Sequence, residues 1–139
     1  MPLVVAAYLG IADAAAGEAQ LAVAGRREPH VIQTMGELLR AHRVATDLVA
    51  AMFADADDLR FDGSDDLSSR ILARKAVASD ALLDTVRLAI EATGGRGFSR
   101  TSPLERLYRD VHGVLFHPLP RAKQTIFSGR IGLGLDPIG

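Results

Sequence analysis

One segment in the first half of the chain constrains the fold more than any other. Between Val31 and Met52, one set of positions recurs at alternating steps of three and four residues, and only His42 among them is polar. The set is Val31, Met35, Leu38, His42, Ala45, Val49 and Met52. A strand would repeat every second residue, so this period predicts a long amphipathic helix. A helix with one apolar face needs partners to cover it, which favours a helix bundle.

A second helix is predicted ahead of that segment, over residues 3–27. The side chains on its expected apolar face are Val4, Tyr8, Ile11, Ala15, Ala19 and Ala22. The small residues of this face would let a neighbouring helix come close. Pro29 then closes this element or starts the next one, because a proline inside a helix loses a backbone hydrogen bond.

A third helix is predicted to begin near Ser64–Leu67 and to continue to Thr93. Asp65 and Asp66 favour its start through capping and through their charge at the positive end of the helix dipole. Its expected apolar positions are Leu72, Ala76, Leu83, Val86 and Ile90, with Ile71, Ala78 and Leu82 beside them. Gly94 and Gly95 end this helix, since glycine accepts the left-handed conformation common after helix C-termini.

The stretch "SPLE", Ser102 to Glu105, predicts the start of a short fourth helix. It combines a capping serine, a proline at the first helical position and a glutamate three residues after the cap. The stretch "HPLP" ends that helix, and a last segment covers residues 121–135. We therefore predict an all-α fold, an antiparallel four-helix bundle with short C-terminal helices, formed by one domain over residues 1–139.

Composition agrees with packed helices and excludes several classes of function. Aromatic residues make up 5% of the chain, and tryptophan and cysteine are absent. The lack of cysteine excludes disulfides, thiolate metal sites and a cysteine nucleophile. The net charge is −1 and we find no basic stripe in the sequence, so we expect no nucleic-acid partner.

The apolar opening "MPLVVAAYLGIADAAAG" lacks a basic leader and is interrupted by Asp13. We interpret it as a buried helix of a cytoplasmic protein. We expect no run to approach the roughly 18 apolar residues of a membrane span, so no membrane partner is predicted.

Three other patterns do not support a catalytic or metal site. The four histidines, His30, His42, His112 and His117, include no pair four residues apart, and His42 is expected to be a core or interface residue with a satisfied hydrogen bond. Residues 58–69 resemble a calcium loop, but Arg60 and Ser69 stand where that site needs oxygen ligands. "GGRGFS" follows a helix rather than a strand, which excludes a dinucleotide fingerprint.

The glycines Gly94, Gly95 and Gly97 leave two interpretations open. A helix C-cap with a tight turn explains one or two of them. Alternatively, a group from outside the chain must approach the backbone closely, and exposed N–H groups in such a turn suit a phosphate. The pair Arg109 and Asp110 likewise fits either a structural ion pair or the orientation of a ligand at the end of the bundle.

The whole stretch "EATGGRGFSRTSPLERLYRD", residues 91–110, resembles the C-terminal signature of acyl-CoA dehydrogenases. That signature reads Q-x-x-G-G-x-G-[YF], followed by P-[LV]-[EQ]-[RK]-x-[YW]-R-D. "AAYLGIADAAAGEA" is similar to the opening of the C-terminal helical domain of the same family. The resemblance covers nearly the whole chain.

The resemblance implies a three-part flavoenzyme of which this chain is the last part. Such an enzyme has an N-terminal helical domain, a middle β-domain and a C-terminal bundle that also forms subunit contacts, so a homo-oligomer (a dimer or tetramer) is expected, together with the missing domains or a partner subunit. FAD lies between these parts. Carried over by position, the FAD contacts become Glu91, Gly94, Gly95 and Gly97, and Arg26 is a weaker match to the arginine that contacts FAD.

The chain departs from the family pattern at the catalytic position. Many members carry a catalytic glutamate shortly after the R-D pair, and Pro118 stands there in this sequence. No catalytic residue is therefore assigned, and His117 is a weak candidate for the role that a histidine has in related flavin-dependent monooxygenases. Glu91 also replaces the usual glutamine, which loses an amide donor.

The resulting expectation is an FAD-dependent acyl-CoA dehydrogenase-like parent enzyme whose isolated C-terminal domain is inactive. Two alternatives remain: the same domain of a flavin-dependent monooxygenase, and a stand-alone helical protein for interaction or oligomerisation.

Overall fold

The computed structural model describes residues 1–57, 60, 63–117 and 119–139. It contains five α-helices within those residues: α1 (Pro2–Ala22), α2 (Pro29–Asp55), α3 (Asp65–Thr93), α4 (Pro103–Val111) and α5 (Arg121–Gly132). Two short 3-10 helices, η2 (Gly94–Arg96) and η3 (His112–Leu115), follow α3 and α4. The same ranges contain no strand, and the predicted all-α class is confirmed. Asp58 and Asp62 of the calcium-like stretch lie outside the described residues.

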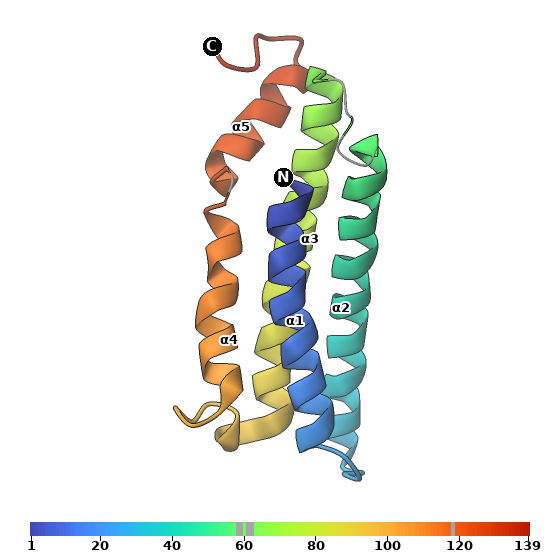
Figure 1. The fold of residues 1–139 in the computed structure, drawn as a ribbon, viewed down its shortest axis with the longest axis vertical. Coiled ribbons are helices and arrows are strands. Elements are labelled where there is room, and N and C mark those ends of the chain that lie inside the picture. Colours follow the sequence, from blue (N-terminus) through green and yellow to red (C-terminus); the bar gives the residue numbers. More distant parts are fainter. Residues whose placement is uncertain (58–59, 61–62, 118) are drawn as a thin grey trace.

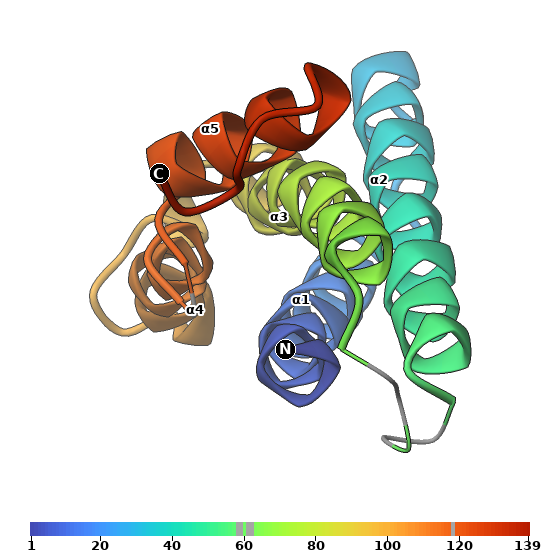
Figure 2. The same ribbon diagram turned by 90° about the horizontal axis from the view of Figure 1, so that it is seen from above.

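The first four α-helices lie alongside one another and alternate in direction along the long axis (Figure 1). α5 continues beyond α4 and packs against α3. Seen from above, α3 lies in the middle of the assembly, with α2 and α4 on opposite sides of it (Figure 2). α3 is thus the central helix, in contact with all four others.

The central position of α3 explains why the one-sided prediction for this helix was incomplete. Its buried side chains point to two sides of the helix and include Leu72, Ala78, Ala81, Leu82, Val86, Leu88 and Ala89. Beyond its first turn, where Asp65 and Asp66 are exposed, only a narrow line of positions on α3 stays exposed, namely Arg70, Ala73, Val77, Asp80, Asp84, Arg87 and Glu91. A helix with neighbours all round must bury more than one apolar face.

The predicted buried face is correct for α2 and only partly correct for α1. On α2, the buried residues Val31, Leu38, Ala45, Val49 and Met52 all belong to the predicted set, which is confirmed. On α1, Ala15 and Ala19 are buried as predicted, but Val4 is 36% exposed. Val5 and Ala12 take the innermost places instead, so the real face is turned relative to the predicted one.

α1 also corrects the expectation about membrane spans. By length and composition alone it is apolar enough to cross a membrane, a test that core helices of bundles and signal sequences pass as well. In this structure α1 packs against α2, α3 and α4 as a bundle helix.

The predicted helix starts are present as specific hydrogen bonds. The Oγ of Ser64 accepts a bond from the N–H of Leu67 at 3.1 Å, and the Oγ of Ser102 accepts one from the N–H of Leu104 at 3.2 Å. The predicted ends are less accurate, because α1 stops at Ala22 rather than near residue 27 and α5 stops at Gly132 rather than near 135.

Candidate functional site

The glycine turn after α3 contains Gly94, Gly95 and Gly97. Backbone conformation and close packing within the chain explain why Gly94 and Gly97 are glycines. Gly94 ends α3 with φ 74° and ψ −157°, a conformation that is open essentially to glycine alone. The N–H of Gly97 then donates to the carbonyl of Gly94 at 2.8 Å and closes the turn. A Cβ on Gly97 would lie 3.0 Å from Cβ of Thr93 and 3.3 Å from the carbonyl oxygen of Ile90, so close packing accounts for that glycine.

Gly95 is different. It is exposed and its φ lies outside the left-handed region, and a Cβ at this position would meet no described atom within 4 Å. A larger residue would therefore fit without strain in the chain as described. Neither backbone conformation nor packing among the described residues explains why this position has no side chain.

Glu91 lies one helical turn before Gly94, and its charge is partly neutralised. It is exposed, and its Oε2 accepts a hydrogen bond from Nη1 of Arg87 at 2.9 Å. This ion pair lies on the surface of α3 and lowers the repulsion that the carboxylate would exert on an anion beside the turn. The replacement of the family's glutamine by Glu91 is thus less unfavourable than the charge alone suggests.

Arg26 lies at the same end of the bundle as the glycine turn. The connection between α1 and α2 packs beside the end of α3, through contacts among Val23, Val31, Met35 and Ala92. The guanidinium of Arg26 is already engaged, because its Nε and Nη2 donate to Oε1 of Glu28 at 3.0 and 2.7 Å.

Glu28 forms an ion pair with Arg26 on the surface of the bundle. The hydrogen bond from Arg26, followed by the backbone N–H groups of Glu28 and Arg27, lowers the pKa of Glu28 from 4.5 to about 2. Glu28 is therefore ionised at any pH near neutrality, and a ligand anion would have to compete with it for Arg26. Both side chains are exposed to solvent, so this competition is modest, and Arg26 stays a predicted cofactor contact.

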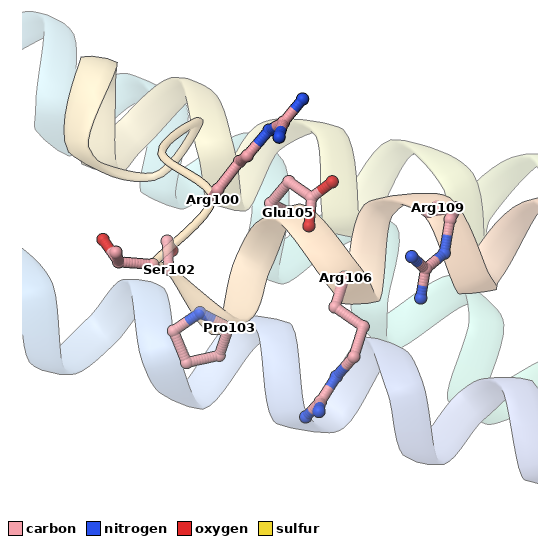
Figure 3. Close-up of a pocket in the computed structure, with 7 residues that line it drawn as sticks. Arg100, Ser102, Pro103, Glu105, Arg106 and Arg109 are labelled. Carbon is pink, nitrogen blue, oxygen red and sulfur yellow. The ribbon is translucent and has the colours of Figure 1, made fainter.

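A hollow at the start of α4 carries more positive charge than the sequence pattern suggested. Its volume is about 330 Å³, and it is lined by Arg100, Thr101, Ser102, Pro103, Glu105, Arg106 and Arg109. Figure 3 shows these side chains on the connection into α4 and along its first turns, with the guanidinium of Arg106 on the other side of the helix from that of Arg100. Neither Arg100 nor Arg106 has an ion-pair partner among the described residues.

The backbone at the start of α4 offers few free N–H donors to an anion in this hollow. The N–H of Leu104 is bound by the Ser102 side chain, the N–H of Glu105 donates to the carbonyl of Ser102 at 3.3 Å, and Pro103 has no N–H. Binding of an anion here would therefore depend on the arginine side chains. Arg109 forms an ion pair with Asp110 at 3.0 Å, as one of the two interpretations of that pair predicted.

His117 lies away from the glycine turn, beyond α4 and η3. It is exposed, and its N–H donates to the carbonyl of Gly113 at 3.3 Å. Pro118, at the family's glutamate position, lies outside the described residues. The structure thus brings Glu91, the glycines and Arg26 to one end of the bundle and does not bring His117 to them.

Sequence reasoning missed Arg100 and Arg106 as candidate site residues. A usable signal was present in the sequence. Arg96 and Arg100 precede the Ser102 cap, while Arg106 and Arg109 follow it three residues apart on one helix face.

Across the described ranges, no group of three or more histidine, aspartate or glutamate residues is arranged to hold a metal ion.

Residues 3–120 match the family model described as "Acyl-CoA dehydrogenase, C-terminal domain". The chain belongs to this family. It is also similar to YdbM of Bacillus subtilis (strain 168), whose name marks it as a candidate acyl-CoA dehydrogenase, with 38% identity over 52 residues. That match covers 37% of this chain and 14% of the relative, so the chain spans only a small part of that protein's length.

Proposed function

We propose that this chain is the C-terminal helical part of an FAD-dependent, acyl-CoA dehydrogenase-like oxidoreductase. Its role there is to contact the phosphates of FAD, to close the flavin site and to join subunits. The observation that carries the proposal is the match of residues 3–120 to the C-terminal domain of acyl-CoA dehydrogenases. The exposed Gly95, with no described atom near the place of a Cβ, leaves room for a group that approaches the backbone from outside the chain, although Gly10 and Gly36 have equally open surroundings.

The charges around the turn fit the pyrophosphate of a dinucleotide. Arg100 and Arg106 line the neighbouring hollow without ion-pair partners among the described residues, and Glu91 is held by Arg87. Guanidinium groups bind phosphate oxygens well, since they offer planar pairs of N–H donors. Of the predicted FAD contacts, the exposed Gly95 would meet a phosphate directly together with Arg100. The N–H of Gly97 is bonded to the carbonyl of Gly94, and the guanidinium of Arg106 lies on the other side of α4 from that of Arg100 (Figure 3).

FAD, when bound, would accept the two electrons that leave the substrate. This chain would contribute binding only. We expect most of the flavin site on a neighbouring subunit and on further domains, as the family resemblance implies, and Pro118 cannot abstract a proton. We therefore expect the chain alone to turn over no acyl-CoA, within a dimeric or tetrameric enzyme of the cytoplasm.

There are two alternatives. One is the same domain of a monooxygenase in which His117 transfers a proton, and the other is a stand-alone interaction protein. All three functions involve association with another chain. Several large apolar side chains are exposed, among them Leu21 at 76%, Ile126 at 62% and Leu133 at 77%. Burial of such side chains against a second surface would stabilise the assembly.

Ligand titration of the ¹⁵N-labelled chain, followed by amide chemical shifts, tests the proposed FAD contact. FAD, ADP and inorganic pyrophosphate should each shift the amides of Gly95 and Gly97, because they share the phosphates. Riboflavin, which has no phosphate, should leave both amides unchanged. Equal shifts with riboflavin, or no shift with the three phosphate compounds, would contradict the proposal.

A pair of variants supplies the control. Gly95→Leu should abolish the shifts, because its side chain would occupy the space in front of the turn. Gly10→Leu, on α1, replaces a glycine whose surroundings are equally open and should bind as the unmodified chain does. Loss of binding in both variants would show a general effect on the fold.

A further inference from the structure

A buried lysine joins the central helix to the connection between η3 and α5. Lys75 on α3 is only 1% exposed and is among the largest fully buried side chains. Its Nζ donates a hydrogen bond to the carbonyl oxygen of Leu119 at 3.1 Å. This bond fixes the backbone just ahead of α5 to the middle of the bundle.

Two further contacts hold the same connection. The Nε2 of Gln124, a residue only 4% exposed, donates to the same carbonyl oxygen of Leu119. Arg121, the first residue of α5, forms an ion pair with Asp80 on α3. Lys75, Gln124 and the Asp80–Arg121 pair together form what we call the α5 clamp.

The packing of α3 alone does not account for this lysine. Among the described residues Nζ has a backbone carbonyl as its partner and no carboxylate, and burial followed by the nearby charge of Arg121 lowers the pKa of Lys75 below its ordinary 10.5. A methionine of similar length would fill the space without desolvating a charge. The Oε1 of Gln124 is also buried with no hydrogen-bond partner in the described structure, which is a second cost at the same place.

We propose that Lys75 is a positioning residue, which holds the backbone at Leu119, and with it the start of α5, against α3 through its buried hydrogen bond. This inference rests on the proposed function for its purpose. The exposed His117 lies two residues before Leu119 in the sequence, next to the position of the catalytic glutamate that the family resemblance implies. By holding the carbonyl of Leu119 against α3, the α5 clamp limits the range of positions that His117 can reach.

Amide hydrogen exchange in the 139-residue chain tests the clamp without any ligand. Lys75→Met should raise exchange at the amides of His117 and Gln124 by about tenfold, while amides of α1 and α2 change by less than about twofold. Lys75→Arg restores a charged donor and should return exchange toward the original rates. Lys123→Met removes the chain's other lysine, which is exposed on α5, and should have no effect.

The NMR signals of the imidazole groups give a readout that a general loss of stability would not reproduce. In Lys75→Met the His117 signals should shift or broaden, while those of His30, His42 and His112 stay unchanged. Arg121→Gln removes only the surface ion pair and leaves the core intact, so it should accelerate exchange at Gln124 even if Lys75→Met does not fold.

Two results would overturn the inference. One is unchanged exchange at His117 and Gln124 in both Lys75→Met and Arg121→Gln. The other is a uniform rise at all helical amides, which would show that Lys75 only stabilises the bundle. Because no ligand is present, these results are independent of the FAD titration, and failure of the proposed function can be recognised separately.

Discussion

The Nε2 of His42 lies 2.5 Å from Oδ1 of Asp13, and this contact links α2 to α1 at the edge of the bundle. The side chain of His42 is 27% exposed and that of Asp13 is 57% exposed. The expected role of His42 as an interface residue with a satisfied hydrogen bond is thus confirmed. Water competes for both groups, so the contact should stabilise the bundle only modestly.

A double-mutant cycle measures that contribution. We expect Asp13→Ala and His42→Ala to show a coupling energy of about 0.5–1 kcal/mol, because a partly exposed pair loses much of its attraction to solvent. Urea unfolding of the two single variants and of the double variant gives this value. Strictly additive effects would mean that the pair does not stabilise the protein.

The ring of Tyr8 on α1 lies against Gly113 of η3. A Cβ at position 113 would lie 3.1 Å from both Cε1 and Cζ of that ring and closer still to its hydroxyl oxygen. Gly113→Ala should therefore destabilise the chain by about 1 kcal/mol, as in other overpacked sites.

Adding Tyr8→Phe to Gly113→Ala should recover part of that loss, because it removes the atom that is most crowded. Thermal unfolding of both variants checks the order of stability. The matched control is Gly10→Ala, which has open surroundings in α1 and should stabilise the helix by about 0.5–1 kcal/mol. Equal effects at positions 10 and 113 would contradict the role of the Tyr8 contact.

Substitution by alanine should affect folding stability strongly at Gly94 and only slightly at its neighbour Gly95. Gly94→Ala forces a side chain into the conformation at φ 74° and should cost about 1–3 kcal/mol of folding free energy. Gly95→Ala has neither strain nor crowding and should change stability by less than about 0.5 kcal/mol. Denaturant unfolding distinguishes the two, and a large loss in Gly95→Ala would show that this position is packed rather than open to an external ligand.

The Arg26–Glu28 pair predicts a pH dependence with a definite sign. The pKa of Glu28 is depressed from 4.5 in the unfolded reference to about 2 in the folded chain, so the unfolded chain binds the proton more readily. The stabilising contribution of Glu28 is complete above pH 4.5 and is lost as the pH falls toward 2.

Unfolding by urea at several acidic pH values, compared between the unmodified chain and Glu28→Gln, measures this contribution. The variant should show a shallower loss of stability between pH 4.5 and 2. Glu37→Gln is the control, since Glu37 is bonded only to the neutral amide of Gln33 in the described structure. Parallel pH profiles for the unmodified chain and Glu28→Gln would show that the ion pair does not persist in solution.

The sequence by itself determined the features that depend on neighbours within a few residues. The spacing from Val31 to Met52 defines the buried face of α2, and the serines Ser64 and Ser102 set the helix starts with bonds that span two or three residues. The motif from Glu91 to Asp110 likewise identified the family over most of the chain. Periodicity and capping are local interactions, which is why a single sequence reveals them.

Only the tertiary structure decided which surfaces meet. It placed α3 in the centre, which buries two sides of that helix, and it turned the face of α1 toward Val5 and Ala12. It also brought Lys75 to the carbonyl of Leu119, 44 residues away in the chain. Contacts at such separations depend on the order and direction in which the helices pack, and no local pattern in the sequence records that arrangement.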